Sequence, residues 1–389
     1  MARYLPTLLS LIIIAGLCGI FVMVFITNVF FTNKLSRYSD DAVCSHISPD
    51  FIRARSLFQS TRKVSNVLIV THPRSGSTLT GDIIQKSKHS FYAFEPLRFA
   101  AETMQLGQPI TFLNGTQRVY NYSRDAAWIE ADLLYRWFTC DFCRVNIKDL
   151  KSKFIESFST NLRTYAYCLK RHYYNRPSRC VIHLQRTCEK ARVRSIKTVR
   201  LLSLESLAIL LERMPSLKVV YLVRDPRGRL ASQASLDPTE WNIVSEQAKI
   251  MCKQMLEELS YLKTIWKPYS ERLNILIYEK FAVNPVDSSN RLFKFLDMDF
   301  SRYLELFVKN ITHANADKTS CYWCTKRTDS QETATRWRRD IDFRNVKAID
   351  NQCNSVYNQL GYIRFKNEVD LRNMSISVIE EIGSHDIFL

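Results

Sequence analysis

Residues 67–78 read VLIVTHPRSGST, and this stretch decides the fold. It opens with an apolar, largely β-branched run that ends before His72, a pattern typical of a buried strand. A turn of small residues follows, and Leu79, Ile83 and Ile84 then recur at helical spacing. The segment therefore predicts a strand, a turn and a helix in direct succession.

The same alternation recurs downstream. The run 217–223, LKVVYLV, is the clearest strand of the chain. Further strands are predicted at 196–202 and 273–278, and helices at 203–213, 239–266 and 289–296. Strands alternating with helices predict an α/β fold, with a P-loop-like parallel sheet flanked by helices. We expect one domain, beginning near residue 63, without an internal boundary.

The composition narrows the class of partner. The chain has 389 residues, of which 46% are hydrophobic, so it can bury a full core and is neither disordered nor collagenous. It carries 55 basic and 38 acidic side chains, a formal net charge of +17. This charge favours an anionic partner: nucleic acid, an acidic lipid surface, a nucleotide or a polyanionic glycan.

The N-terminal region predicts a membrane anchor. Residues 8–26 are apolar and uncharged, and apolar character resumes at 29–31. About 20 such residues cross a bilayer, whereas a cleaved signal peptide has a shorter apolar run and a small-residue cleavage site. We expect a cytoplasmic tail at 1–7, a transmembrane signal-anchor at 8–31, a stem at 32–62 and a lumenal domain at 63–389.

Cysteines and glycosylation motifs favour the lumenal orientation. Ten of the eleven cysteines follow the apolar run, an even number consistent with disulfides whose pairing stays open. Four positions match the N-glycosylation pattern: Asn114, Asn121, Asn310 and Asn373. A lumenal domain would not meet nucleic acid, which removes that partner.

The turn at 73–78 has the chemistry of a phosphate-binding loop. Small residues entering a helix present backbone N–H groups and the positive end of the helix dipole to an anion. Ser77 and Thr78 add hydroxyl donors, and Arg74 adds a cation. The loop lacks the lysine of a Walker A motif, which disfavours kinase or ATPase chemistry. An ordinary turn between strand and helix is the alternative.

A second motif follows the clearest strand. Residues 223–232 read VRDPRGRLAS, which puts Arg224 at a strand's carboxyl end, where α/β sheets bind ligands. Ser232 lies two helical turns further on, so both side chains can reach one anion. The alternative is a helix cap at Asp225 beside surface arginines.

Together the two motifs resemble the 5′-phosphosulfate and 3′-phosphate motifs of sulfotransferases. The resemblance covers residues 64–362, is weakest between 100 and 195, and is closest to the Golgi carbohydrate 6-O-sulfotransferases. Further matching segments are Phe94-Glu95-Pro96, Tyr278-Glu279, Asn284-Pro285, the run 335–338 (TRWR), Cys353 and the run 360–362.

The resemblance implies a donor and the residues that hold it. The donor is 3′-phosphoadenosine 5′-phosphosulfate (PAPS), a co-substrate, and no metal is required. The residues implied at the 5′-phosphosulfate are Arg74, Ser75, Gly76, Ser77 and Thr78. Those implied at the 3′-phosphate are Arg224 and Ser232, with Arg338 approaching the same group.

The expected chemistry is an in-line displacement that depends on positioning and charge stabilisation. Arg74 would stabilise the leaving phosphate oxygen, and Glu95 would take the proton of the acceptor hydroxyl. The alternative for Glu95 is a structural carboxylate paired with Arg98 or Arg74. His72 and His89 are weaker candidates for the base.

The leading function is therefore sulfuryl transfer to C6 of GlcNAc, galactose or GalNAc by a type II Golgi membrane enzyme. The rivals are a tyrosylprotein sulfotransferase and a catalytically inactive lumenal glycan-binding protein; the C-terminal 336–362 pattern favours the carbohydrate branch. The acceptor sugar, and whether the chain forms a homodimer, stay open.

Two further clusters have structural alternatives. Two Cys-x-x-Cys pairs, at 140–143 and 321–324, could form a Cys₄ zinc site, although disulfides are favoured in the lumen. The aromatic residues of 165–174 could stack on sugar rings, although core packing is favoured.

Basic charge concentrates between the two nucleotide motifs. Residues 144–200 hold fifteen Lys and Arg against three acidic residues, which is +12 of the net +17. We expect this segment to contact an acidic glycan, and charge reversal at Lys170 and Arg171 to raise the KM of a sulfated acceptor. A solvated basic surface is the alternative.

Overall fold

The computed structural model describes residues 63–314 and 326–380. The chain divides into two compact units, Met1–Thr61 and Arg62–Leu389, and the description below concerns the second. The predicted tail, membrane anchor and stem lie outside the described residues. Within the described ranges, none of the helices combines the length and apolar character that a membrane crossing needs.

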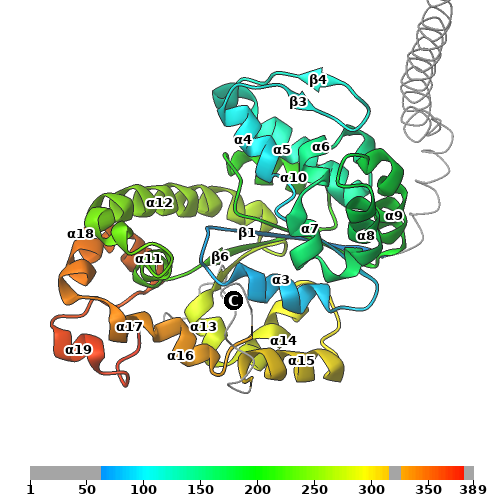
Figure 1. The fold of residues 1–389 in the computed structure, drawn as a ribbon. Coiled ribbons are helices and arrows are strands. Elements are labelled where there is room, and N and C mark those ends of the chain that lie inside the picture. Colours follow the sequence, from blue (N-terminus) through cyan, green and yellow to red (C-terminus); the bar gives the residue numbers. More distant parts are fainter. Residues whose placement is uncertain (1–62, 315–325, 381–389) are drawn as a thin grey trace, which may run out of the picture. The chain divides into compact units, whose positions relative to one another are not determined.

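Five parallel strands form the central sheet, in the order β2-β5-β1-β6-β7 (Figure 1). In the register of the ladder, Leu68 pairs with Ile196 on one side and with Val219 on the other. The strands are β1 (Ser65–Thr71), β2 (Ser90–Phe94), β5 (Val193–Thr198), β6 (Leu217–Val223) and β7 (Leu273–Ile277). The predicted parallel sheet is confirmed.

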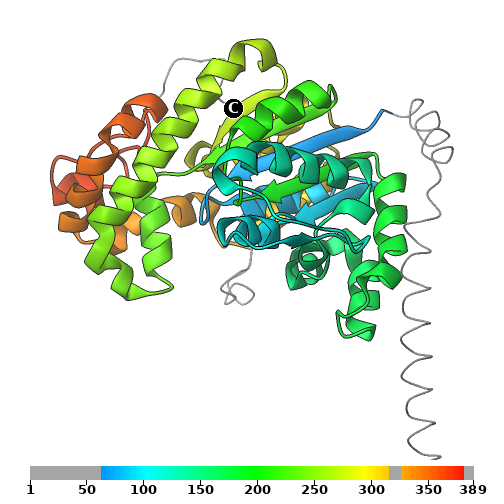
Figure 2. The same cartoon turned by 90° about the horizontal axis from the view of Figure 1, so that it is seen from above.

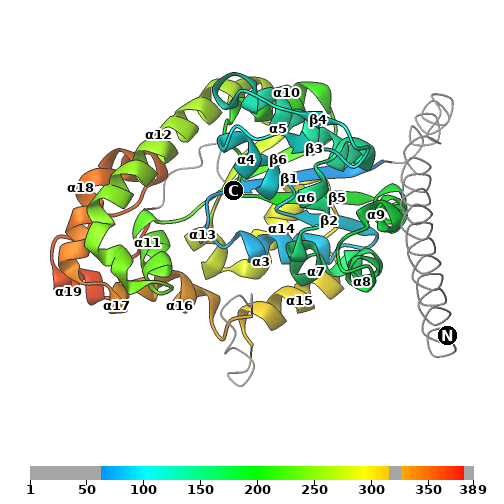
Figure 3. The ribbon, with the colours of Figure 1, turned by 45° about the horizontal axis from the view of Figure 1, so that its top comes forward.

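Helices cover both faces of this sheet (Figures 1 and 3). One face carries α3 (Ser77–Gln85), α13 (Tyr278–Val283), α14 (Pro285–Phe295) and α15 (Arg302–Thr312). The other carries α5 (Tyr122–Thr139), α10 (Glu205–Arg213) and part of α12 (Val244–Tyr269). Both faces are shielded from water, which explains the long apolar runs in β1 and β6.

Two helical groups extend the sheet at opposite ends, as Figures 2 and 3 show. At one end α12 packs along α18. That group comprises α11 (Pro226–Ala234), α16 (Ser330–Thr335), α17 (Trp337–Asp340), α18 (Phe343–Leu360) and α19 (Glu368–Arg372). The other end carries α7 (Lys153–Phe158), α8 (Arg163–Arg171) and α9 (Pro177–Lys190).

Remaining short elements join these layers. They are α4 (Arg98–Gln105), α6 (Ile147–Leu150), the antiparallel pair β3 (Ile110–Thr111) and β4 (Gln117–Arg118), and three 3-10 turns at Phe142–Arg144, Thr160–Leu162 and Pro238–Ile243.

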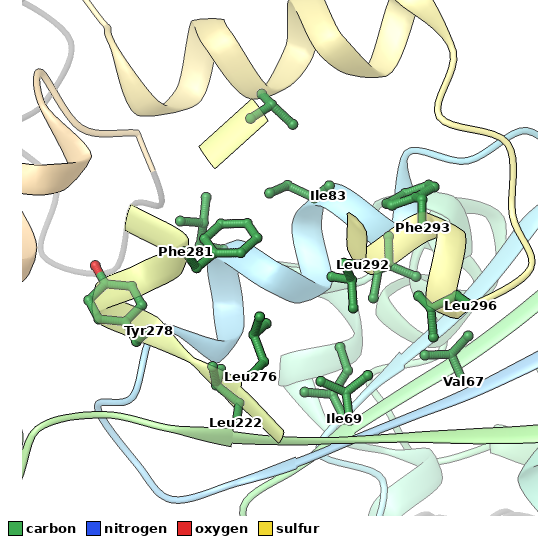
Figure 4. Close-up of a cluster of buried hydrophobic side chains, with 14 of the residues drawn as sticks. Val67, Ile69, Ile83, Leu222, Leu276, Tyr278, Phe281, Leu292, Phe293 and Leu296 are labelled. Carbon is green, nitrogen blue, oxygen red and sulfur yellow. The ribbon is translucent and has the colours of Figure 1, made fainter. Parts of the chain in front are cut away.

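A buried apolar cluster fixes α3 and α13 against the sheet (Figure 4). Ile69 of β1 and Leu222 of β6 face Ile83 of α3 and Phe281 of α13 within it. Tyr278 stands at the edge of this cluster, with its hydroxyl directed away from the apolar side chains. The core therefore determines where the turn between β1 and α3 lies relative to α13.

Disulfides hold the helical groups together. They join Cys140 to Cys188, Cys168 to Cys180 and Cys252 to Cys353, and Cys143 is disulfide-bonded as well. Because the sulfurs at 140 and 143 are already in disulfides, they cannot serve as thiolate ligands of a Cys₄ zinc site. The preference for disulfides is confirmed for this pair, whereas the pair at 321–324 lies outside the described residues.

The aromatic segment 165–174 divides between core and surface. Tyr165 is buried and its hydroxyl donates to the carbonyl of Leu150 at 2.9 Å, as expected for core packing. Tyr167 and Tyr173 are 68% and 84% exposed. They are surface residues, so core packing describes only part of this cluster.

Some predicted boundaries were wrong. The strand predicted at 196–202 occupies Val193–Thr198, because the sheet buries polar residues that interrupt the apolar pattern. One of them, Arg194, donates through Nε and Nη1 to the carbonyls of Cys188 and Phe138, which stabilises its charge in the core. The helix predicted from 239 begins as a 3-10 turn and becomes α-helical at Val244.

Candidate functional site

The sheet topology creates a ligand site beside its central strand. The chain leaves β1 toward β2 on one side and later crosses from β5 to β6 on the other. The carboxyl ends of β1 and β6 therefore flank the point where the strand order reverses, where open α/β sheets bind ligands. A cleft of about 1310 Å³ is lined there by Arg74 and Arg224, which follow the two strands.

The loop after β1 is shaped for an anion. Gly76 precedes α3 with φ +85°, no side chain of the described residues caps this helix, and its first turn contains no acidic residue. The N–H groups of the first turn and the positive end of the helix dipole are thus left for a ligand. Ser75 and Ser77 are buried beside Gly76, and Thr78 lines the cleft.

Gly76 also allows a close contact that no other residue type would permit. A Cβ atom built at this position would lie 2.3 Å from Cδ2 of Tyr278. Tyr278 in turn lies under the guanidinium of Arg224, whose centre is 4.8 Å from the ring centroid. The loop, the ring and the arginine therefore form one packed unit.

The two motifs meet in this unit. Arg74 Nε donates to Ser232 Oγ at 2.9 Å, and Arg224 Nη1 donates to the carbonyl of Arg74 at 2.9 Å. These residues lie about 150 positions apart in sequence. The structure thus brings Arg74, Gly76, Ser77 and Thr78 together with Arg224 and Ser232 at one wall of the cleft. Ser75 is buried in the same loop and does not line the cleft.

Two buried donors at this wall make no hydrogen bond within the part of the chain that the structure describes. Nε of Arg224 and Nε1 of Trp337 have no hydrogen-bond acceptor among the described residues. Both flank Gly228, where an added Cβ would lie 3.2 Å from each of these nitrogen atoms. Buried donors are normally satisfied, so this pair is suited to an anionic or polar ligand. Sequence reasoning missed Trp337, although it stands next to Arg338 in the matched TRWR run.

The structure places Arg338 elsewhere. Its side chain is buried and does not line the cleft. The guanidinium donates to four backbone carbonyls at 2.7–3.1 Å, those of Asp370, Leu371, Asn373 and Ile376. The predicted approach to a nucleotide phosphate is therefore replaced by anchoring of the C-terminal segment, and its neighbour Arg336 lines the cleft instead.

A buried carboxyl lies behind Arg224. Glu279 Oε1 accepts from the N–H of Asp225 at 3.0 Å and Oε2 accepts from the hydroxyl of Tyr362 at 2.8 Å. Burial, and then the nearby charge of Asp225, raise the pKa of Glu279 to about 7. Arg224 Nε lies 4.0 Å from this carboxyl. The charge behind Arg224 therefore changes near neutral pH.

Asp225 itself has the structural role that was the alternative for this motif. It caps α11 by accepting from the N–H of Arg227 at 2.9 Å and forms an ion pair with the Arg227 guanidinium. Both side chains are completely buried, so Arg227 is not a surface arginine.

Glu95 lines the same cleft as Arg74. It follows β2 with φ +53°, a conformation that costs energy in a residue other than glycine. Its Oε1 accepts from Lys197 Nζ at 2.5 Å and its Oε2 accepts from the N–H of Val199 at 3.1 Å. The carboxylate is thus held in one orientation by a lysine, and not by Arg98 or Arg74 as its structural alternative supposed.

The two histidines do not line the cleft. His72 Nε2 lies 2.6 Å from Glu258 Oε2, and the same carboxylate accepts from the hydroxyl of Tyr221. His89 is exposed at the far, amino-terminal end of β2. Neither is placed to act on a ligand between Arg74 and Glu95.

Comparison with known proteins agrees with this geometry. The family model described as "Sulfotransferase domain" matches residues 65–361. Carbohydrate sulfotransferase 1 of Mus musculus is 27% identical over 369 residues, which covers 82% of this chain and 84% of the relative. Carbohydrate sulfotransferase 4 of Mus musculus is 23% identical over 359 residues, with 82% and 88% covered. A solved sulfotransferase domain from the curacin biosynthetic pathway is 16% identical with a TM-score of 0.40, covering 76% of this chain and 99% of that domain.

The family match includes both strand-end motifs and most of the chain. The chain therefore belongs to the sulfotransferase family and is a sulfotransferase enzyme. Its curated relatives are carbohydrate sulfotransferases, as the resemblance in its sequence predicted. The sulfate donor of this family is PAPS, and a cationic loop, an open helix N-terminus and two unpartnered donors fit its two anionic ends.

Proposed function

We propose that this enzyme transfers the sulfuryl group of PAPS to a glycan hydroxyl, at C6 of GlcNAc, galactose or GalNAc. The observation that carries the proposal is the convergence of Arg74, Arg224 and Ser232, from two distant motifs, in a cleft that also contains Glu95. The carbohydrate acceptor is supported by the names of the curated relatives.

The donor would be held at the wall formed by α3 and α11. Arg74, Ser75, Gly76, Ser77 and Thr78 would bind the 5′-phosphosulfate through N–H groups, hydroxyls and one cation. The 3′-phosphate would be bound by Arg224 and Ser232, to which we add Trp337. The unpartnered donors at Arg224 Nε and Trp337 Nε1 support this assignment. Arg338 is left out because its guanidinium is fully engaged by carbonyls.

The bound donor supplies the sulfuryl group, and the protein supplies charge and position. Arg74 and the first-turn N–H groups would stabilise the charge that grows on the leaving phosphate oxygen. Glu95 would accept the proton of the acceptor hydroxyl. Lys197 and the N–H of Val199 would keep its carboxylate oriented toward the cleft while it does so.

We also propose a Golgi location, with the anchor at 8–31 and the catalytic unit in the lumen. The disulfides support an oxidising compartment, where such bonds form and persist. Expression of the full chain in cells, with protease protection of intact vesicles, tests this orientation. Digestion of the catalytic unit from the cytoplasmic side would overturn it.

The activity is tested with radiolabelled PAPS and the chain lacking residues 1–61, the boundary of the second compact unit. Desulfated keratan and chondroitin are offered beside an acidic tyrosine peptide. We expect label on the carbohydrate, at C6 by disaccharide analysis, and label on the peptide alone would refute the proposal.

Glu95→Gln separates catalysis from binding. The variant should lose at least 100-fold in kcat, since general base catalysis contributes about 10²–10⁴-fold. It should keep the thermal shift that 3′-phosphoadenosine 5′-phosphate (PAP) produces, which is about 2.7 kcal/mol of stabilisation at 100 times Kd. Unchanged turnover would remove Glu95 from the reaction, and absence of a shift in the wild type would remove the donor site.

A further inference from the structure

The cleft contains more positive charge than the donor requires. Eight of its lining residues are basic and two are acidic. Arg74 and Arg224 belong to the donor wall, and Lys197 is paired with Glu95. Arg327 and Arg336 also line the cleft, and Arg327 interacts electrostatically with Arg336, Tyr278 and Arg224 of the donor wall. The remaining basic residues of the lining are Arg98, Lys153 and Arg200.

Backbone hydrogen bonds place two of these residues next to Glu95, the proposed base. The N–H of Arg98 donates to the carbonyl of Glu95 at 3.2 Å. Arg200 directly follows Val199, whose N–H donates to the Glu95 carboxylate at 3.1 Å. The backbone of both residues therefore lies beside Glu95, and both line the cleft that contains this carboxylate.

Within 63–314 and 326–380, no ion pair involves Arg98, Lys153 or Arg200. Asp149 and Glu156 interact with Arg98 and Lys153 only electrostatically, without a direct ion pair. Arg98 instead lies over the ring of Phe154, with its guanidinium 4.4 Å from the ring centroid. Stacking uses the face of the guanidinium and leaves its N–H edges for a carboxylate or sulfate ester.

Buried carboxyl groups fix the segments that carry the two arginines. Asp149 accepts from the N–H groups of residues 99 and 100, at 2.7 and 3.0 Å, and so holds the start of α4 beside Arg98. Glu130 accepts from the N–H groups of residues 202 and 203, at 2.6 and 3.2 Å, and so holds the loop that follows Arg200. Both side chains are almost fully buried, so the arginines are presented by rigid backbone.

We propose that Arg98, Arg200 and Lys153 form an anion subsite for the acceptor, which binds a sulfate ester or a carboxylate on a sugar adjacent to the reacting one. The subsite rests on the proposed function and narrows its substrate to glycans that are already anionic. It replaces the broader idea that the whole basic segment 144–200 contacts the glycan.

Most of that segment serves other purposes. Of its fifteen basic residues only Lys153, Lys197 and Arg200 line the cleft. Lys170 pairs with Glu156 at the surface, 2.6 Å apart. The remaining cation of the subsite, Arg98, lies outside the segment and could not be selected by charge density.

The test compares two double variants. R98Q/R200Q removes two subsite charges, and R171Q/R179Q removes two exposed charges of α8 and α9 that do not line the cleft. Each variant is assayed with three acceptors. The first is a neutral oligosaccharide of desulfated keratan, and the second is the same oligosaccharide with a sulfate on the sugar next to the reacting one. The third is desulfated chondroitin, whose only anionic groups are carboxylates. PAP binding by thermal shift confirms that each variant is folded.

We expect R98Q/R200Q to raise the acceptor KM about 10- to 100-fold for whichever anionic oligosaccharide the wild type prefers, as loss of a charge-assisted contact predicts. The KM of the neutral oligosaccharide and the PAP affinity should stay within about 2-fold, and R171Q/R179Q should behave as wild type. Comparison of the KM values for the sulfated oligosaccharide and for desulfated chondroitin identifies whether the subsite binds a sulfate ester or a carboxylate. Isothermal titration of the preferred oligosaccharide in the presence of PAP should show the same loss of affinity.

Equal KM changes in both double variants would overturn the subsite in favour of general surface attraction. A wild type that prefers the neutral oligosaccharide would also overturn it, while leaving carbohydrate sulfation intact. Failure of the wild type to sulfate any of the three acceptors would instead refute the proposed function, and the subsite with it.

Discussion

Replacing Gly76 by alanine tests whether the turn after β1 and Tyr278 act as one unit. The added Cβ atom destabilises the folded state in two ways. The positive φ of +85° costs an alanine about 1–2 kcal/mol. The contact of 2.3 Å with Tyr278 forces the ring to move by about 1 Å or more, and overpacking of this kind costs about 1–3 kcal/mol.

The expected loss of stability is therefore about 2–5 kcal/mol, or a fall in Tm of roughly 3–7 °C for a folded unit of this size. Gly107→Ala is the matched control, because Gly107 has φ +62° and nothing within 4 Å of an added Cβ. It carries only the backbone cost, about 1–2 kcal/mol and roughly 1–3 °C.

Nucleotide binding should separate the two variants further. Displacing Tyr278 disturbs the ring under Arg224, so we expect the Kd of PAP to rise about 10- to 100-fold in Gly76→Ala, the loss of one charge-assisted contact. Gly107→Ala should bind PAP as the wild type does. Calorimetry for stability and titration with PAP measure both effects. Equal loss of stability in the two variants, or unchanged PAP affinity in Gly76→Ala, would refute the reasoning.

Three further changes test neighbouring contacts. Trp337→Phe removes an unpartnered donor and should raise the Kd of PAP about 5- to 10-fold by titration calorimetry, in line with the loss of one neutral hydrogen bond; an unchanged Kd would contradict its assignment. Arg338→Met leaves buried carbonyls unsatisfied and should cost more than about 2 kcal/mol in urea unfolding, with the PAP affinity of the folded protein within about 3-fold. A large loss of affinity at unchanged stability would restore the nucleotide role of Arg338. Burial raises the pKa of Glu279 from 4.5 to about 7, so its proton stabilises the fold at low pH and this contribution is lost as the pH rises through 7. The stability of the wild type relative to Glu279→Gln should therefore fall by roughly 3 kcal/mol between pH 4.5 and pH 7, and a flat or rising difference would show that folding does not raise the pKa of Glu279.

The strand β1 and the loop that follows it could be predicted from the sequence, because the residue patterns that specify them are local. An apolar run followed by small residues and a helical repeat determines β1, the turn and α3 within about 20 residues. The run 217–223 was likewise predicted with the bounds it has in β6. Here the hydrophobic pattern and the buried environment agree.

Polar residues in buried positions could not be interpreted in this way. Arg194, Arg227 and Arg338 are all basic in sequence, and all are buried and donate to carbonyls or a carboxylate. The local sequence shows that such a residue is charged, but it does not show which groups accept its hydrogen bonds. These acceptors come from segments up to 136 positions away. The prediction for Arg338 differed from the structure for this reason.

The sequence by itself determined the class of fold and located the two candidate anion-binding motifs, because turn chemistry and hydrophobic periodicity act over short stretches of chain. The residues proposed for sulfuryl transfer came from its resemblance to the sulfotransferases. Only the tertiary structure decided that Arg74 bonds Ser232, that Lys197 orients Glu95, and that Arg98 and Arg200 line the same cleft as that carboxylate. These contacts depend on strand order, since β5 and β6 flank β1 in space although they follow it by more than a hundred residues.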